Sequence, residues 1–204
     1  QNQQLLEELN AAWERAAAED EVRVILLRAN GPHFSAGHDM APDEVKKNPA
    51  FAKISRAIPT RGTQELYNWE AKHYFGFSRR WRDIPKPSIA AVQGACIAAG
   101  LMLCWPCDLI VAADNAWFSD PTIVMGIAGV EYHGHTWELG PRKAKEMLFT
   151  AKPVDALEAE RRGMVNRVVP LAELDAQARA LALDIAAKHP HALAMAKRAV
   201  NQTM

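Results

Sequence analysis

Apolar residues recur along the chain in two patterns that alternate with each other. Between residues 3 and 18 they return every three or four positions, which predicts an amphipathic helix. Residues 22 to 28 form a β-branched run that ends at Asn30-Gly31-Pro32, and they predict a buried strand. The chain therefore starts with one helix and one strand of comparable hydrophobic character.

The same alternation continues to the end of the chain. Further strands are predicted at 88–94, 108–113, 116–119 and 164–169, and further helices at 142–149, 171–188 and 191–203. Asp155 and Glu158 have the spacing of a helix N-terminal capping box, and Gly163 stands in the C-cap place of the same short helix. Strands that alternate with helices predict an α/β fold with parallel pairing.

Residues 41 to 85 interrupt this regular pattern. They carry many charges together with aromatic side chains, among them Trp69, Tyr74 and Trp81. We expect a helical insertion here that forms a pocket wall.

Composition narrows the class of protein. The 204 residues suit one domain, and 24 Lys and Arg balance 24 Asp and Glu, so we expect neither nucleic acid nor a membrane surface as partner. No apolar run approaches the roughly 20 residues that span a bilayer. Three cysteines, an odd number in apolar surroundings, favour a reducing, cytoplasmic setting.

Several short motifs suggest side-chain chemistry. The sequence CWPC at 104–107 resembles a redox pair, although it ends an apolar segment, where buried structural cysteines are the simpler interpretation. Ser35 lacks the Gly-x-Ser-x-Gly pattern of a nucleophile elbow. Glu131, His133 and His135 lie within EYHGH, but their spacing does not place two imidazoles on one helix face for a metal.

Two turns rich in small residues suggest backbone chemistry instead. The loop GPHFSAGHDM (31–40) follows one strand, and GACIAAG (94–100) follows another. Amide N–H groups at such strand-to-helix turns can stabilise a developing oxyanion. From the residues alone, a two-donor oxyanion hole and simple tight packing of small side chains stay equally open.

Four segments in order resemble one family, the enoyl-CoA hydratase/isomerase (crotonase) superfamily. They are FSAGHD (34–39), IAAVQGACIAAGLML (89–103), CDLIVAAD (107–114) and ALEAERRGMVNRVVP (156–170). The resemblance runs from residue 1 to 204 and implies the ClpP/crotonase-like fold of repeated ββα units with C-terminal helices. It implies a core over 1–170 without its first strand, and an incomplete helical oligomerisation region over 171–204.

The resemblance also implies a substrate site. The backbone N–H groups of His38 and Ala99 would bind the thioester carbonyl of an acyl-CoA and stabilise its enolate. Further substrate-binding positions would be Ala36, Gly37, Asp39, Met40, Met102 and Thr122.

The acid-base residue is where the sequence departs from the family. Typical hydratases use two glutamates, and Met102 and Thr122 stand in their places, so a mechanism with two carboxylates is not expected. The remaining candidates are Glu131, which leads, then Asp120 and His133. One base suits proton shuttling in double-bond isomerisation better than it suits hydration.

We therefore expect a cytoplasmic enoyl-CoA hydratase or isomerase without a metal or other cofactor, since coenzyme A is part of the substrate. A homotrimer or a dimer of trimers is the assembly that the resemblance implies. The alternative is a non-catalytic acyl-CoA-binding protein that has lost both glutamates. A thiol oxidoreductase that uses CWPC is the third hypothesis.

Overall fold

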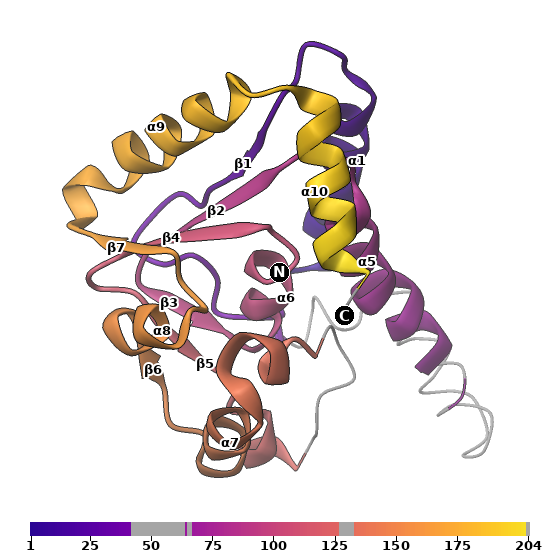
Figure 1. Ribbon diagram of the computed structural model, residues 1–204. Coiled ribbons are helices and arrows are strands. Elements are labelled where there is room, and N and C mark those ends of the chain that lie inside the picture. Colours follow the sequence, from indigo (N-terminus) through magenta and orange to yellow (C-terminus); the bar gives the residue numbers. More distant parts are fainter. Residues whose placement is uncertain (42–63, 65–66, 127–132, 203–204) are drawn as a thin grey trace.

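Two small β-sheets form the centre of the computed structural model, which describes residues 1–41, 64, 67–126 and 133–202 (Figure 1). The first sheet has four parallel strands in the order β1-β2-β4-β7. They are Ile25–Leu27, Ser88–Val92, Leu109–Ala113 and Arg167–Val169. The second sheet has the order β3-β5-β6, with strands Ala95–Ile97, Trp117–Ser119 and Val154–Asp155.

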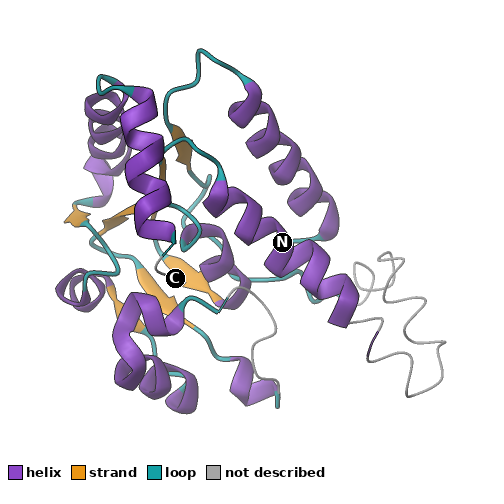
Figure 2. Cartoon of the chain, turned by 45° about the vertical axis from the view of Figure 1, so that its right-hand side comes forward, coloured by secondary structure: helices purple, strands orange, loops and turns teal. Residues whose placement is uncertain are grey.

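Helices surround both sheets (Figure 2). The α-helices are α1 (Gln3–Ala18), α5 (Gly76–Asp83), α6 (Leu101–Cys104), α7 (His135–Thr150), α8 (Ala156–Arg162), α9 (Leu174–Ala186) and α10 (Pro190–Asn201). A π-helical turn, Ala71–Phe75, leads into α5, and 3-10 turns span Ala98–Gly100, Thr122–Met125 and Leu171–Glu173. Among the described residues, no helix is both long enough and apolar enough to cross a membrane.

The four-stranded sheet divides the core into two layers. Successive side chains of a strand point to opposite faces. In β2, Ile89 and Ala91 accordingly pack with the layer under α9, while Ala90 and Val92 join the larger cluster on the other face. Figure 1 shows α9 lying across one side of the sheet and α6 with the second sheet on the other.

The predicted elements are mostly present, with several differences. The strands predicted at 22–28 and 164–169 are shorter, Ile25–Leu27 and Arg167–Val169. Strands β3 and β6 were not predicted, and β6 pairs antiparallel with β5, so pairing is not parallel throughout. The helix predicted at 142–149 is the second segment of α7, which starts at His135 and is broken at Gly140, whose φ of 73° and ψ of 158° are not helical. Gly140 and Pro141 hid this first turn from the hydrophobic pattern.

The predicted cap of α8 is confirmed. The side chain of Asp155 accepts a hydrogen bond from the backbone N–H of Glu158 at 2.7 Å. Gly163 ends the helix in the left-handed conformation, with a φ of 82°. The aromatic insertion is confirmed only in part, because residues 42–63 lie outside the described residues.

Asp108 ties the C-terminal helix α10 to the edge of the first sheet. One of its carboxylate oxygens accepts hydrogen bonds from the backbone N–H and the hydroxyl of Ser88 at 2.8 and 2.9 Å. The same oxygen lies 2.8 Å from Nζ of Lys197, whose side chain is only 7% exposed. The buried ammonium of α10 thus depends on this carboxylate.

Replacing Asp108 by Ala should leave the buried Lys197 charge without a counter-ion, with the Lys86 carbonyl at 3.0 Å as its remaining hydrogen-bond acceptor. We expect the free energy of unfolding to fall by about 3 kcal/mol, as for other broken buried ion pairs. Urea unfolding followed by circular dichroism measures this change. The control is Asp184→Ala, which removes the exposed partner of Lys188 and should cost less than about 1 kcal/mol. Equal effects of the two variants would contradict the assigned role of Asp108.

Glu138, in the first turn of α7, has fewer favourable contacts than Asp108 to offset the burial of its charge. Burial raises its pKa to about 7, and the Arg82 guanidinium of α5 opposes this only in part. The folded chain therefore holds this proton more tightly than the unfolded chain, whose glutamate has a pKa of 4.5. As a result, the contribution of Glu138 to stability declines as the pH rises through this interval.

A Glu138→Gln variant should remove this pH dependence. Relative to the wild type, its free energy of unfolding should increase steadily between about pH 5 and pH 7 and then level off, because glutamine has no proton to lose. Urea titrations of both proteins at half-unit pH steps measure the difference. Parallel curves for the two proteins would show that Glu138 is not held in its neutral form.

Candidate active site

The two turns of small residues lie against each other in the structure. Ser35 forms a parallel bridge with Cys96 of β3. Its backbone N–H donates to the carbonyl of Ala95 at 3.0 Å, and its carbonyl accepts from the N–H of Ile97 at 2.9 Å. The loop at 31–40 is thereby held as an extra strand beside β3, directly before the turn Ala98–Gly100.

Two glycines make this approach possible. A Cβ at Gly100 would lie 2.8 Å from the carbonyl oxygen of Ser35, closer than atoms pack. Gly37 has a φ of 94°, which favours glycine, and a Cβ there would lie 3.2 Å from the carbonyl oxygen of Ile97 and 3.8 Å from the backbone nitrogen of Ala99. The structure therefore brings the residue before His38 next to Ala99.

The side chain of His38 is occupied by packing. Its ring stacks on that of Tyr74, with ring centroids 4.2 Å apart. Ala99 is fully buried in the second position of a 3-10 turn, where the first N–H groups have no acceptor within the turn. This geometry is consistent with backbone donors at both positions, and the oxyanion hole stays a prediction.

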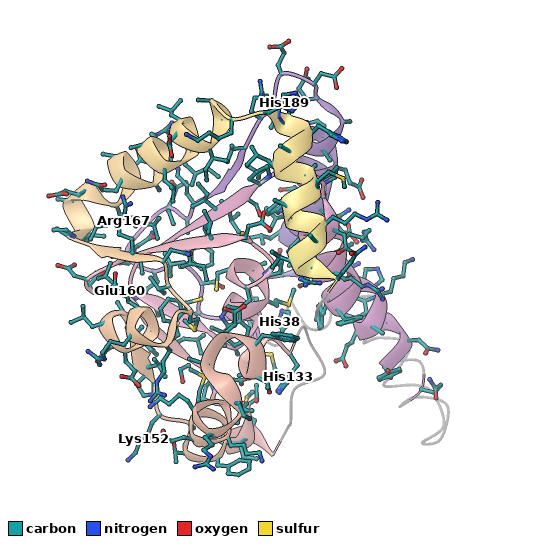
Figure 3. All side chains as sticks on the ribbon, in the orientation of Figure 1. His38, His133, Lys152, Glu160, Arg167 and His189 are labelled. Carbon is teal, nitrogen blue, oxygen red and sulfur yellow. The ribbon has the colours of Figure 1, made fainter. Side chains whose placement is uncertain are left out.

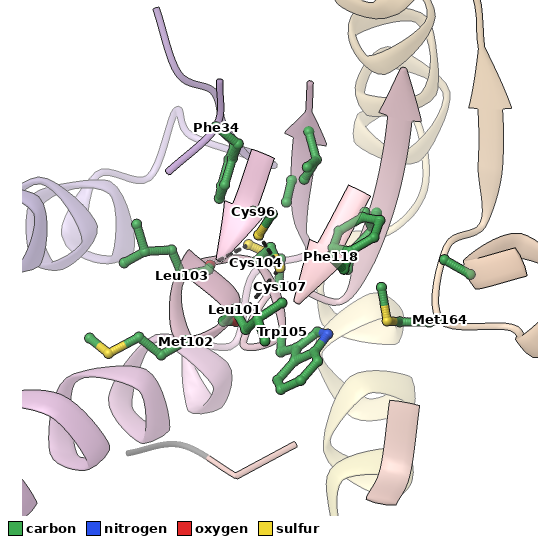
Figure 4. Packing of buried hydrophobic residues seen from close by; sticks show 14 of the residues in the cluster. Phe34, Cys96, Leu101, Met102, Leu103, Cys104, Trp105, Cys107, Phe118 and Met164 are labelled. Atoms are coloured by element: carbon green, nitrogen blue, oxygen red, sulfur yellow. Dashed lines mark hydrogen bonds between the residues drawn. The ribbon is translucent and has the colours of Figure 1, made fainter. Parts of the chain in front are cut away.

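The predicted substrate-binding residues fall into two groups. Ala36, Asp39 and Met40 are exposed on the loop, where a ligand can reach them. Met102 is 1% exposed and belongs to the hydrophobic core (Figure 4). Its backbone carbonyl accepts a hydrogen bond from the buried hydroxyl of Ser78 at 3.0 Å. Thr122 is half-buried and contacts Asp120.

Asp120 lies directly after β5, and its carboxylate is buried. One oxygen accepts hydrogen bonds from the hydroxyl and backbone N–H of Thr122 at 2.7 and 3.2 Å. The other lies 3.0 Å from Nε2 of His135. Burial alone raises the pKa of Asp120, but its contacts with His135 and Thr122 outweigh burial, so the pKa lies below its ordinary value. Asp120 is therefore a carboxylate at neutral pH.

His133 is exposed beside this pair. Its ring centroid lies 4.2 Å from that of His135. Partial burial and the neighbouring His135 lower the pKa of His133, although Asp120 opposes them. Figure 3 shows His133 in the same part of the molecule as His38. Glu131, the leading acid-base candidate from the sequence, lies outside the described residues.

The cysteines of CWPC are buried in the core (Figure 4). Burial raises the pKa values of Cys104 and Cys107, so both favour the neutral thiol over the reactive thiolate. Sγ of Cys104 lies 3.6 Å from Sγ of Cys96, and both are fully buried. This environment suits structural cysteines and does not suit thiol oxidoreductase chemistry.

Sequence reasoning did not select His135 or Glu138 as acid-base residues. EYHGH drew attention to a metal, and the helix that carries both residues was predicted to begin later. Among the described residues, no group of three or more metal-ligating side chains comes together. The one available signal was Pro141. Proline often stands in the first turn of a helix, and here it begins the second segment of α7, directly after the short segment that carries both residues.

Comparison with known proteins extends this picture. The sequence profile of the enoyl-CoA hydratase/isomerase family matches residues 1–204. EchA13 of Mycobacterium tuberculosis, whose name assigns it provisionally to the enoyl-CoA hydratases, is 42% identical over 216 residues. That alignment covers 100% of this chain and 66% of the relative, so the chain spans slightly less than two thirds of the relative's length.

Solved structures agree in fold. A probable enoyl-CoA hydratase from Mycobacterium thermoresistibile matches with a TM-score of 0.88 and 58% identity, covering 100% of this chain and 78% of that chain. A probable enoyl-CoA hydratase from Mycobacterium smegmatis matches with a TM-score of 0.89 and 60% identity, covering 100% of this chain and 76% of that chain. The α/β crotonase fold expected from the sequence is therefore confirmed, and the chain belongs to the enoyl-CoA hydratase/isomerase family.

Proposed function

We propose that this chain forms the site of an acyl-CoA enzyme that stabilises a thioester enolate, and that it hydrates or isomerises enoyl-CoA substrates. The observation that carries the proposal is the contact between Gly37 and the turn Ala98–Gly100. This contact supports the proposal because it brings the residue before His38 close to the backbone nitrogen of Ala99. Two such donors would each stabilise the enolate oxygen by roughly 3 kcal/mol.

The similarity to proteins named as enoyl-CoA hydratases supports this substrate class. Isomerisation is the reaction that we favour between the two. The two positions where typical hydratases carry glutamates hold side chains without a carboxylate. Met102 is buried in the core, and Thr122 donates its hydroxyl to Asp120. Isomerisation needs one group that removes and returns a proton, whereas hydration needs water to be activated as well.

We also propose that the C-terminal helices pack against further copies of the chain, as a homotrimer or a dimer of trimers. Large apolar side chains on α9 and α10 are exposed in the isolated chain, namely Leu183, Met195 and Val200. An interface between copies would bury this apolar surface.

Activity is tested with enoyl-CoA thioesters of increasing chain length. With 2-enoyl substrates, hydration is followed as loss of the conjugated thioester absorbance. With 3-enoyl substrates, isomerisation is followed as gain of the same absorbance. We expect turnover of at least one 3-enoyl-CoA. Tight binding of acyl-CoA without turnover of any substrate would instead support the non-catalytic acyl-CoA-binding protein.

The role of the His38 backbone is tested by His38→Pro, which removes the N–H and its donor. We expect kcat to fall by about 10²–10³-fold, the usual effect of losing one oxyanion donor. The matched variant His38→Ala removes the imidazole but keeps the N–H, and it should lose less than about tenfold. If His38→Ala lost as much activity as His38→Pro, the imidazole rather than the backbone would be the working group.

A further inference from the structure

The carboxyl ends of β3 and β5 place Asp120 beside the proposed oxyanion hole. The two strands are parallel, and Ile97 is in register with Ser119. Ala98 and Asp120 are the next residues of each strand, so they leave the sheet at the same edge, and neighbouring strands lie about 4.8 Å apart. The buried carboxylate therefore stands one strand away from the turn that carries Ala99.

Asp120 holds a second buried group, His135, in the first turn of α7. The side chains of His135 and Asp120 are 4% and 7% exposed. Thr122 occupies only Oδ1 of the carboxylate, which leaves Oδ2 to face Nε2 of His135 at 3.0 Å. Trp105 packs edge-on against the imidazole, with ring centroids 4.6 Å apart. The imidazole is thus fixed by a carboxylate and an aromatic ring.

One nitrogen of His135 is nevertheless unsatisfied. Nε2 faces the Asp120 carboxylate at 3.0 Å, but Nδ1 has no hydrogen-bond partner among the described residues, and Nε1 of the adjacent Trp105 has none either. A buried polar group without a partner costs about 1–3 kcal/mol, so native proteins retain few of them without a functional reason. A buried imidazole with an unoccupied nitrogen and a carboxylate neighbour has the composition of a general base.

His133 is the exposed neighbour of this buried pair. Its ring contacts that of His135 and is exposed, whereas His135 and Asp120 are enclosed. Among the described residues, the charged and titratable groups around His135 are Asp120 after β5, His133 before α7, and Glu138 one turn further along α7. Of these, only Asp120 lies within 4 Å as an ionic partner of His135.

We propose that His135 is the residue that transfers the substrate's proton, with Asp120 as its positioning carboxylate; this rests on the proposed function. His135 takes a proton from Cα of a 3-enoyl-CoA, and the C–H electron pair forms the enolate, whose negative charge lies on the thioester oxygen. The imidazolium, stabilised by Asp120, then returns a proton to Cγ while the enolate electrons form the new C2–C3 double bond. No other reactant is consumed.

The proton step is measured by exchange of the Cα protons of butyryl-CoA in D₂O, followed by NMR. The thioester is saturated, so exchange reports proton removal alone. His135→Gln should lower the exchange rate by about 10²–10⁴-fold, while the affinity for butyryl-CoA in calorimetry stays within about threefold because the oxyanion turns are intact. The control His189→Gln, at the opposite end of the molecule in Figure 3, should keep the wild-type rate.

Asp120→Asn keeps the shape of the carboxylate and removes its charge, and it provides a second test if His135→Gln fails to fold. We expect kcat to fall more than tenfold with an unchanged KM, because the imidazolium loses its stabilising charge. Wild-type exchange in folded His135→Gln, or wild-type kcat in Asp120→Asn, would overturn the proposal. The same holds if Glu138→Gln abolishes exchange and His135→Gln does not.

The outcomes separate this inference from the proposed function. A wild-type chain that neither turns over any enoyl-CoA nor exchanges Cα protons would overturn the proposed function and this inference with it. An active wild type whose exchange survives His135→Gln would overturn this inference alone.

Discussion

The hydrogen bonds between Ser35 and β3 are the interaction on which the rest of the site depends. They join a loop from the start of the chain to a strand in its middle, and they require that Gly100 carry no side chain. A methyl group there would collide with the Ser35 carbonyl and separate the two turns. The spacing of His38 and Ala99 is therefore set by backbone contacts, which hold position more rigidly than long side chains.

The acidic side chains Asp108, Asp120 and Glu138 differ in the hydrogen bonds and charges that offset their burial. Asp108 receives two hydrogen bonds and an ammonium, and it serves to hold α10 in place. Asp120 receives hydrogen bonds on one oxygen and leaves the other to a histidine. Burial raises the pKa of Glu138, and the charge of the Arg82 guanidinium opposes this only in part. Asp120 is therefore held as a carboxylate beside a histidine, whereas Glu138 favours its neutral form.

Particular residues show how far the sequence alone reaches. The capping box at Asp155 and Glu158 was predicted because capping is a local interaction between residues close in sequence. The closeness of the two small-residue turns came from the family resemblance, since spacing alone left tight packing equally open. The first turn of α7 was missed, because Gly140 and Pro141 break the periodicity from which a helix is predicted.

The sequence by itself determined the α/β class, the order of its main elements and the positions of the two turns of small residues. These features follow from local periodicity, capping and glycine placement, which depend on near neighbours. Only the tertiary structure paired Asp120 with His135 and placed Trp105 against the imidazole. That pairing depends on the register of β3 with β5 and on the path of the chain back to α7. Both are contacts between distant segments, and no local pattern encodes them.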